Sequence, residues 1–351
     1  MAARVGLAIF GFGNMGKIHF KNCMISPRVD VRWIVCLNVN DAKSMVESYN
    51  LHTKCLSTDE SNIDNVLNDK SVKAVIICSP TDTHENLVIK ALAADKDVFC
   101  EKPITPDFKS TAQCYELAEE RHRILLCGFQ RRFDPSFSQL HDNLQNKVLG
   151  NLRLLKISSH DMAPPPIEYI KASGGILIDS TIHDIDMSSW LAGSKPTSIY
   201  VQSSAFDKDI AKYDCDLVVV TIMFNNGVIS VIDNGRQISY GYHQQLEALC
   251  DKGVLNVCIL LQALCDKGVL NVTNRRVDQL EISSAERSVI PSIDQHYSTR
   301  YTDAYRLILD HFIDVIQGIC EPIITKDHVL QVNKLVEAGK KSQALKTPVY
   351  L

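Results

Sequence analysis

The sequence lacks the features of a membrane-bound, exported or nucleic-acid-binding protein. No apolar run approaches the ~20 residues that cross a bilayer, and the first residues contain no small-residue cleavage site of the kind that ends a signal peptide. Lysine and arginine (37) nearly balance aspartate and glutamate (41), so the net charge of −4 offers no basic excess to nucleic acid or an anionic membrane. We therefore expect a cytoplasmic protein with neither kind of partner.

Paired cysteines are also missing, although the chain contains 12 cysteines. They are scattered from Cys23 to Cys320, and none forms the CxxC spacing that is typical of zinc sites. Several lie in apolar runs, where cysteine behaves as a small hydrophobic residue. The sequence therefore predicts no metal site and indicates a reducing compartment rather than a disulfide framework.

The length of 351 residues, with 45% hydrophobic and 22% charged residues, is typical of a globular protein of two domains. In residues 1–125, strand-like runs alternate with helical segments, which predicts an α/β domain with a doubly wound parallel sheet. In residues 126–351, strand-like runs and tight turns dominate, which predicts an α+β domain with a large, mainly antiparallel sheet.

A glycine-rich turn follows the first apolar run, VGLAIF. Gly11, Gly13 and Gly16 stand in GxGxxG spacing before a helical segment. The first glycine permits a tight turn, the second lets the backbone approach a pyrophosphate, and the third lets helix and strand pack closely. The amino end of the helix attracts the phosphates. The expected cofactor contacts in this turn are Gly11, Phe12, Gly13, Asn14, Met15 and Gly16.

The acidic residue that usually binds the ribose is absent from the end of the second predicted strand. Asn38, 22 residues after Gly16, occupies its expected place. An amide can hydrogen-bond to ribose but does not repel a 2′-phosphate. No arginine follows to bind such a phosphate, although Lys43 and Arg32 are near in sequence. We expect NAD as the cofactor, and NADP remains an alternative.

Polar residues also follow the third and fourth predicted strands, VKAVIICSP and KDVFCEKP. Ligands of a parallel sheet bind at the carboxyl ends of its strands. We therefore expect Lys102 to point into the cofactor crevice. The other cofactor contacts expected at these strand ends are Ser79, Pro80, Thr81, His84 and Glu101.

Asp179 and His183 lie four residues apart in the apolar segment GILIDSTIHDIDM. Residues at this spacing share one helix face, where a carboxylate can hold an imidazole in one orientation for proton transfer. The alternative is a solvated helix start, with Asp179 placed there by the helix dipole. We expect Asp184 and Asp186 to be surface or capping groups without a role in the chemistry.

Six motifs, in this order and spacing, resemble the Gfo/Idh/MocA oxidoreductases, and most of all their inositol 2-dehydrogenase branch: GFGNMG, CSPTDTHENL, CEKP, GFQRRFDP, SGGILIDSTIHDIDM and YGYH. The resemblance extends from Val5 to about Gln343. It implies a Rossmann domain, a second domain with an open-faced sheet, and homo-oligomers (dimers or tetramers) assembled through that sheet. It also implies oxidation of a ring hydroxyl of a cyclic polyol or sugar with a nicotinamide cofactor.

The resemblance further implies roles for single residues. It makes Lys102 the catalytic lysine, and Asp179 and His183 the catalytic pair. The substrate contacts that it implies are Arg131, His160 and Tyr240. Tyr242 is an alternative to Tyr240, and many relatives have arginine in place of His160, so that position could shift substrate preference.

A 15-residue duplication interrupts the second half of the chain. The segment LEALCDKGVLNV at 246–257 recurs as LQALCDKGVLNV at 261–272, with eleven of twelve positions identical. Each copy is predicted to form strand, turn and strand, and two copies cannot occupy the same positions of one sheet. We expect one copy to loop out or to add a hairpin at a sheet edge.

Two other functions stay open. One is a dehydrogenase of a sugar or a dihydrodiol. The other is a catalytically silent, dinucleotide-binding regulator, which Asn38 and the duplication would suit but which the presence of Lys102, Asp179 and His183 argues against.

Overall fold

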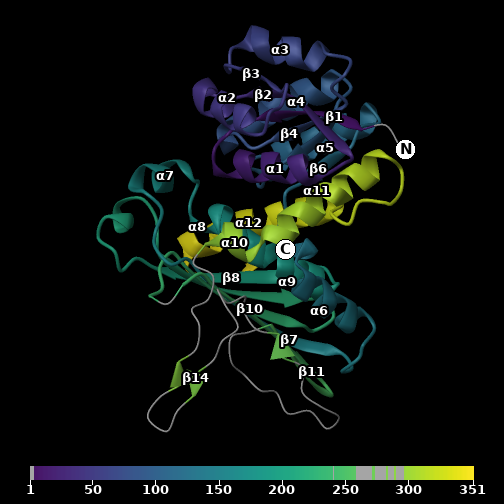
Figure 1. Ribbon diagram of the computed structural model, residues 1–351. Coiled ribbons are helices and arrows are strands. Elements are labelled where there is room, and N and C mark those ends of the chain that lie inside the picture. The colour runs from purple at the N-terminus through teal and green to yellow at the C-terminus, as the bar shows by residue number, and fades with distance from the viewer. Residues whose placement is uncertain (1–3, 240, 258–270, 273–281, 284–287, 290–295) are drawn as a thin grey trace. The chain divides into compact units, whose positions relative to one another are not determined.

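The computed structural model describes residues 4–239, 241–257, 271–272, 282–283, 288–289 and 296–351 (Figure 1). They form two compact units. Unit 1 comprises Met1–Gln130 and Asp303–Leu330, and unit 2 comprises Arg131–Thr302 and Gln331–Leu351. Tyr240 and most of the second copy of the duplication lie outside the described residues.

Unit 1 is built on a six-stranded parallel sheet in the order β3-β2-β1-β4-β5-β6. Its strands are β1 (Val5–Phe10), β2 (Val29–Val35), β3 (Lys54–Leu56), β4 (Ala74–Ile77), β5 (Asp97–Cys100) and β6 (Leu125–Cys127). Every residue of β1, β4 and β5 is buried, as expected where helices cover both faces. The strand order reverses between β1 and β4, and ligands bind at the carboxyl ends of strands beside such a point. The predicted doubly wound sheet is confirmed.

The helices of unit 1 come from both ends of the chain. They are α1 (Asn14–Ile25), α2 (Val39–Ser48), α3 (Glu60–Asn68), η1 (Thr81–Thr83), α4 (His84–Ala93), α5 (Phe108–Glu120) and, much later, α11 (Thr302–Ile316). Phe312 of α11 packs edge-on against Phe99 with ring centres 5.9 Å apart, and Arg28 binds Asp314 at 2.6 Å. The apolar face of α11 thus completes the core of this unit. The division at residue 130, with 303–330 returning to unit 1, differs from the predicted domains 1–125 and 126–351.

Unit 2 contains an eight-stranded sheet in the order β13-β12-β11-β7-β10-β9-β8-β16. Its strands are β7 (Leu152–His160), β8 (Pro196–Ser204), β9 (Leu217–Phe224), β10 (Ile229–Gly235), β11 (His243–Cys250), β12 (Gly253–Val257), β13 (Asn271–Val272) and β16 (Val349–Tyr350). Only the β7–β10 and β12–β13 pairs of this sheet are parallel. The predicted, mainly antiparallel sheet is confirmed. A short pair, β14 (Ile282–Ser283) with β15 (Ser288–Val289), stands apart from it.

Helices cover one face of this sheet, so its two faces differ. The helical segments are η2 (Gln130–Phe133), α6 (Pro135–Gln145), α7 (Ile167–Ala172), α8 (Ile176–Asp179), α9 (Ile182–Ala192), η3 (Ile210–Lys212), α10 (Tyr297–Arg300) and α12 (Lys326–Leu345). On β9, Val220 is fully buried, whereas Val219 and Met223 are 36% and 37% exposed. Period-two alternation therefore leaves one face partly open.

The first copy of the duplication forms the β11–β12 hairpin, in which Leu246 lies opposite Val257. The last two residues of the second copy form β13, which pairs in parallel with their own counterparts, Asn271 beside Asn256 and Val272 beside Val257. The first copy therefore holds the positions inside the sheet. The described end of the second copy lies at the sheet edge.

Candidate functional site

The predicted site residues are divided between the two units. Unit 1 holds the glycine-rich turn, Asn38 and Lys102, and unit 2 holds the pair Asp179 and His183. The predicted substrate contacts Arg131 and His160 also lie in unit 2, whereas Tyr240 lies outside the described residues.

The three glycines after β1 make a surface that fits phosphates. A Cβ on Gly11, whose φ is +90°, would lie 2.5 Å from the Ser79 nitrogen, and one on Gly16 would lie 2.2 Å from the Gly11 oxygen. A Cβ on Gly13 would meet nothing within 4 Å. Gly13 is the N-cap of α1, and no side chain caps that helix. The first amide N–H groups of α1 are therefore available to an anion, so these residues fit a dinucleotide.

The neighbours of this turn serve different parts of the fold. Phe12 is buried against Phe20, with ring centres 5.5 Å apart, so only its backbone can face a ligand. Asn14 and Met15 begin α1. Asn38 is exposed and caps α2, where its Oδ1 accepts the Asp41 N–H at 3.2 Å. The side-chain NH₂ of Asn38 is the group that suits a ribose oxygen.

A negative charge lies close to Asn38 after all. Asp41, in the first turn of α2, pairs with Lys17 of α1 at 2.7 Å. The Asp41 carboxylate therefore lies three residues after Asn38 and is already paired with a cation.

Two buried side chains hold the loop that carries Lys102. Glu101 is 8% exposed, accepts a hydrogen bond from His19 Nε2 at 2.7 Å, and also accepts the Lys102 backbone N–H at 3.3 Å. His84 is 1% exposed, with Nδ1 2.8 Å from the Pro103 oxygen and Nε2 2.9 Å from the Ser79 oxygen. Glu101 and His84 thus connect the carboxyl ends of β4 and β5, and their side chains face protein groups. Lys102 is half-buried beside them.

The ring of His84 faces two acceptors. Burial lowers the pKa of His84, although its contacts with the Pro103 and Ser79 carbonyls oppose that shift. A neutral imidazole can donate to only one of the two carbonyl oxygens. The remaining residues of this loop are Ser79, whose hydroxyl lies 2.6 Å from that of Thr83, and the adjacent Pro80 and Thr81.

Asp179 and His183 do not share one uninterrupted helix. Asp179 ends α8, His183 is the second residue of α9, and Ser180 and Thr181 separate the two helices. The Thr181 N–H and hydroxyl both donate to the Ile176 oxygen, at 2.9 and 3.2 Å, and the His183 N–H donates to the Ser180 oxygen at 3.2 Å. A threonine hydroxyl that bonds to a preceding carbonyl in this way distorts helices. This explains why the helical hydrogen bonding is interrupted between α8 and α9.

The Asp179 carboxylate is held firmly. Its Oδ1 accepts the Tyr169 hydroxyl at 2.8 Å, and its Oδ2 accepts Nη1 of Arg236 at 3.1 Å. Arg236 is 1% exposed, and its Nη2 donates to Asp214 at 2.8 Å. Burial disfavours the charged guanidinium, but the hydrogen bond to Asp214 and the charge of Asp179 outweigh it and raise the pKa of Arg236. The Asp179 side chain is only 12% exposed, so the alternative of a solvated helix start is wrong.

The expectation that Asp184 and Asp186 are surface or capping groups is also wrong. Asp184 is fully buried and accepts hydrogen bonds from Arg131 at 2.5 Å and Asn234 at 2.9 Å. Asp186 is 1% exposed and pairs with Arg132 at 2.6 Å. Buried carboxylates need such partners, since an unpaired buried charge costs several kcal/mol. Arg131 is thus bound to Asp184, and among the described residues its Nε has no partner.

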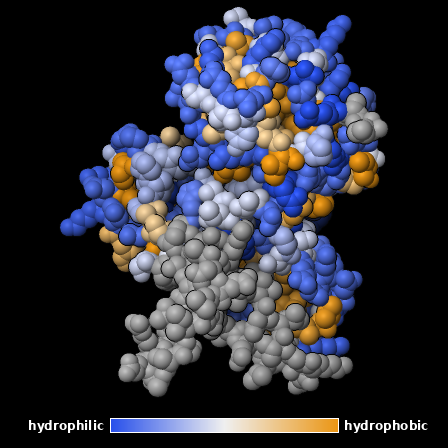
Figure 2. Space-filling model, viewed as in Figure 1, coloured by the Kyte–Doolittle hydropathy of each residue, from blue (hydrophilic) through white to orange (hydrophobic). Residues whose placement is uncertain are grey.

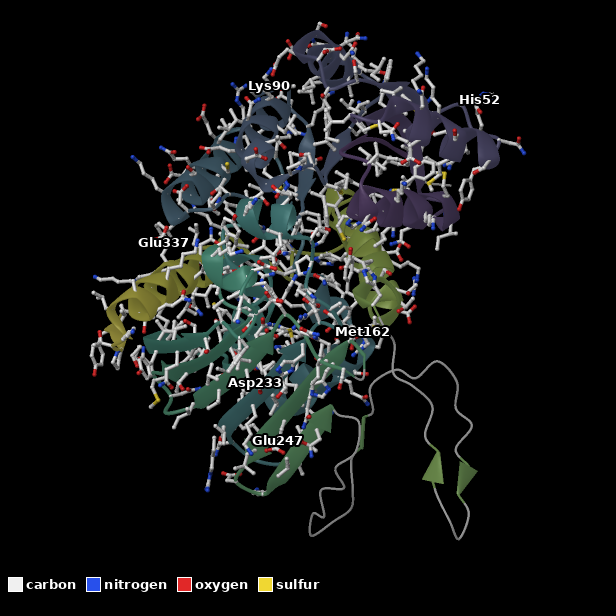
Figure 3. The ribbon with its side chains drawn as sticks, turned by 90° about the vertical axis from the view of Figure 1, so that its left-hand side faces the viewer. His52, Lys90, Met162, Asp233, Glu247 and Glu337 are labelled. Carbon is white, nitrogen blue, oxygen red and sulfur yellow. The ribbon has the colours of Figure 1, made fainter. Side chains whose placement is uncertain are left out.

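His160 lies on the other face of the sheet from this network. Its Nε2 pairs with Asp233 at 3.0 Å, and Ser158 donates to the same carboxylate at 2.5 Å. Ser159, between them, donates to Asp184 at 2.6 Å. Because successive strand residues point to opposite faces, the structure does not bring His160 together with Asp179. Figure 3 labels Asp233 on the strands of unit 2.

The carboxylate after His160 was not predicted as a site residue. Asp161 follows the end of β7, at the edge where Asp179 and Arg236 lie, and burial together with the negative charge of Asp179 raises its pKa to about 6. No donor to its side chain is found among the residues that the structure describes. Its place directly after a strand is a signal that could have identified it. Arg236 directly follows β10 and carries the same signal, whereas nothing local marks Asp214.

Other site types find no support in the described part of the chain. No group of three His, Cys, Asp or Glu residues there is placed to hold a metal ion. No helix among those residues has the length and apolar character of a membrane span. The coloured atoms of Figure 2 show apolar patches separated by hydrophilic ones.

Tyr242, the alternative to Tyr240, is 8% exposed, and burial raises its pKa.

Comparison with known proteins agrees with this arrangement. The model of the oxidoreductase family with an NAD-binding Rossmann fold matches residues 5–129, and that of the GFO/IDH/MocA C-terminal domain matches residues 137–256. The uncharacterized oxidoreductase YrbE of Bacillus subtilis is 31% identical over 99% of this chain and 97% of its own.

Two further relatives match over nearly their whole length. The inositol 2-dehydrogenase of Rhizobium meliloti is 31% identical over 99% of each chain. The crystal structure of a myo-inositol dehydrogenase from Corynebacterium glutamicum has a TM-score of 0.87 and 29% identity, again over 99% of each chain. Fold, glycine-rich turn and full-length similarity lead to one conclusion: this chain is a member of the Gfo/Idh/MocA family of NAD-binding oxidoreductases.

Proposed function

We propose that this oxidoreductase oxidises a ring hydroxyl of a cyclic polyol, with inositol as the substrate and NAD as the cofactor. The observation that carries the proposal is the fixed Asp179 carboxylate, which Arg236 and Tyr169 hold four residues before His183. Such a carboxylate serves proton transfer rather than solvation. The names of the two full-length relatives above support inositol as the substrate.

Each of the three catalytic residues has one task in this proposal. His183 accepts the proton of the reacting hydroxyl, because imidazole titrates near neutral pH. Asp179 orients His183 and stabilises the imidazolium that forms. The Lys102 ammonium holds the reacting oxygen and stabilises its growing negative charge, an effect worth about 3 kcal/mol where similar groups were removed. When bound, the oxidised nicotinamide supplies the two-electron acceptor for the carbinol carbon.

The residues that would hold the dinucleotide are those of unit 1. The Gly11–Gly16 turn and the first N–H groups of α1 suit the pyrophosphate, and the Asn38 amide suits the ribose. Asp41, three residues after Asn38, supports NAD over NADP because its carboxylate disfavours an added 2′-phosphate. Lys17 offsets part of that charge, so a comparison of the two cofactors tests this choice directly.

The substrate contacts need revision within this proposal. Arg131 is bound to Asp184, so we assign it a structural role in the site rather than direct contact with the substrate. Asp161 feels the charge of Asp179, whereas His160 pairs with Asp233. A carboxylate can accept hydrogen bonds from substrate hydroxyls. We propose Asp161 as a hydroxyl anchor and keep Tyr240 as a prediction.

Assembly and location complete the proposal. The partly open sheet face, with Val219 and Met223, supports a homo-oligomer formed through that face. None of the ten cysteines within the described residues forms a disulfide, which supports a reducing, cytoplasmic location.

The decisive experiment mixes purified protein with NAD or NADP and a panel of inositols, aldoses and dihydrodiols, and follows the absorbance of the reduced cofactor. We expect turnover of an inositol with NAD that Lys102→Ala and His183→Ala each lower by about 100-fold or more. Turnover of aldoses or dihydrodiols alone would favour the second substrate class. Dinucleotide binding without any turnover would overturn the proposal in favour of a regulator.

A further inference from the structure

A buried chain of charges holds Asp179, which lies four residues before the proposed base, His183. Arg236, the residue after β10, bridges two carboxylates: Nη1 to Asp179 at 3.1 Å and Nη2 to Asp214 at 2.8 Å. The side chains are 1%, 12% and 10% exposed, in the order Arg236, Asp179, Asp214. The Arg236 N–H is itself fixed by the Asp216 oxygen at 2.8 Å. This geometry leaves the guanidinium little freedom.

The net charge of the Asp179–Arg236–Asp214 group determines how strongly Asp179 can stabilise an imidazolium. A guanidinium paired with Asp179 alone would neutralise that carboxylate, and a neutralised Asp179 could not stabilise an imidazolium. Asp214 shares the guanidinium, so two carboxylates and one guanidinium carry a net charge of −1 between them. Asp179 is thus held in place by Arg236 while Asp214 offsets the cation. Charges of this kind, within hydrogen-bonding distance and shielded from water, act strongly on a neighbouring titratable group.

We propose that Arg236 and Asp214 are positioning residues that act through Asp179 to set how strongly His183 holds its proton. The proposal rests on the function proposed above, in which His183 is the base. Neither residue touches the substrate in this account. Arg236 limits the negative charge that His183 feels, and Asp214 restores part of it.

Other titratable groups also face this chain of charges, and all of them except Tyr169 are left unchanged in the test. Tyr169 of α7 donates to Asp179, and Lys340 of α12 lies near Asp214. Asp161 after β7 faces both Asp179 and Arg236. Cys215 lies beside Asp214 and near Arg236, and Tyr297 of α10 lies near Tyr169.

The test compares three variants, two that should raise the pH of the acid limb, where kcat/KM falls as the pH is lowered, and one that should lower it. Arg236→Gln removes the cation, so Asp179 attracts the His183 proton more strongly and the acid limb of kcat/KM moves up by about 0.5 to 1 pH unit. Asp214→Asn leaves the Arg236 charge to Asp179 alone, so the acid limb moves down by a similar amount. Tyr169→Phe removes one hydrogen bond from Asp179 and moves the limb up by a smaller amount. Because Tyr169 is 51% exposed, this variant is expected to fold even if Arg236→Gln does not.

Asp186→Asn is the matched control, because it too removes one carboxylate from a buried arginine pair of unit 2. It is expected to lower the melting temperature without moving the acid limb. The second readout needs no cofactor: the NMR titration of the His183 ring, identified by its loss in His183→Ala, moves in the same directions as the limb.

The outcomes separate the two proposals. A wild-type protein without polyol turnover, or a fully active His183→Ala, overturns the proposed function. Suppose instead that the wild-type protein turns over its substrate normally. The positioning role alone is then overturned if the acid limbs stay in place, or if they move in the same direction in Asp214→Asn and Tyr169→Phe. Limbs that move in opposite directions in those two variants, with Asp186→Asn unmoved, establish it.

Discussion

At the scale of single residues, five aspartates of unit 2 differ in their charged partners because their surroundings differ. Asp184 and Asp186 are neutralised by buried arginines, and Asp179 shares a guanidinium with Asp214. Asp161 has no such partner among the described residues, and its pKa is raised to about 6. Sequence spacing drew attention to Asp179, and the structure shows that Arg236 and Tyr169 hold its carboxylate. The spacing could not reveal the partners, because those partners come from other strands and helices.

Lys102 gives the first prediction at this scale. Lys102→Ala is expected to lower kcat by about 100- to 1,000-fold, as loss of a group that stabilises an oxyanion does. KM for NAD is expected to change little, since the glycine-rich turn is untouched. Steady-state kinetics measures both. Lys109→Ala, an exposed lysine at the start of α5, is the control and should keep wild-type kinetics. A KM effect without a kcat effect would make Lys102 a binding residue instead.

Asp161 gives a prediction about stability and pH. Its folded-state pKa of about 6 lies above the ordinary value of 3.8, so the folded protein binds this proton more tightly than the unfolded chain. The stabilisation that this proton gives is present below pH ~4 and is lost as the pH rises through 6. Asp161→Asn should therefore raise the free energy of unfolding at pH 7.5 by about 1 to 3 kcal/mol, with the difference vanishing near pH 4. Urea unfolding at both pH values measures this. An equal difference at both would contradict it.

At the scale of elements, the sequence predicted strands and helices well and their interruptions poorly. The predicted strands at KDVFCEKP and DLVVVTIMF contain β5 and β9. The break between α8 and α9 was not predicted, since it depends on Thr181 bonding to the Ile176 oxygen. The partners of the β7 residues were not predicted either, because one position of alternation decides that Ser159 joins the Asp184 side and His160 the Asp233 side.

The duplication gives a prediction at the scale of elements. Deleting 258–272 leaves the β11–β12 hairpin and its Lys156–Glu247 pair, which is 2.7 Å long. Turnover and fold should be retained, because changing the length of a connection costs little closure entropy. Deleting 246–260 instead gives the same chain with glutamine at the place of Glu247. This matched variant should be less stable by no more than about 1 kcal/mol. Loss of folding in both deletions would show that the second copy is structurally required.

At the scale of the whole molecule, both fold classes were predictable but the division of the chain was not. Hydrophobic periodicity reports whether a segment is a strand or a helix, whereas α11 joins unit 1 through contacts between residues more than 200 positions apart, such as Phe312 with Phe99. Only tertiary packing decides such a return of the chain.

The proposed assembly gives a prediction at this scale. Met223→Glu places a charge on the partly open face of the unit 2 sheet and should shift the protein to a smaller species, measured by light scattering after size exclusion. Ile25→Glu, at a residue of unit 1 that is 67% exposed, is the control and should leave the mass unchanged. A monomeric wild-type protein would contradict the proposed oligomer.

The proposed mechanism requires Lys102 and His183 to act on the same hydroxyl of one substrate. A double-mutant cycle on kcat for inositol oxidation tests it most directly, using Lys102→Ala, His183→Ala and the double variant. Residues that act as a unit are far from additive, so we predict a double variant about as slow as the slower single variant. A double variant whose loss equals the product of the two single losses would contradict the claim.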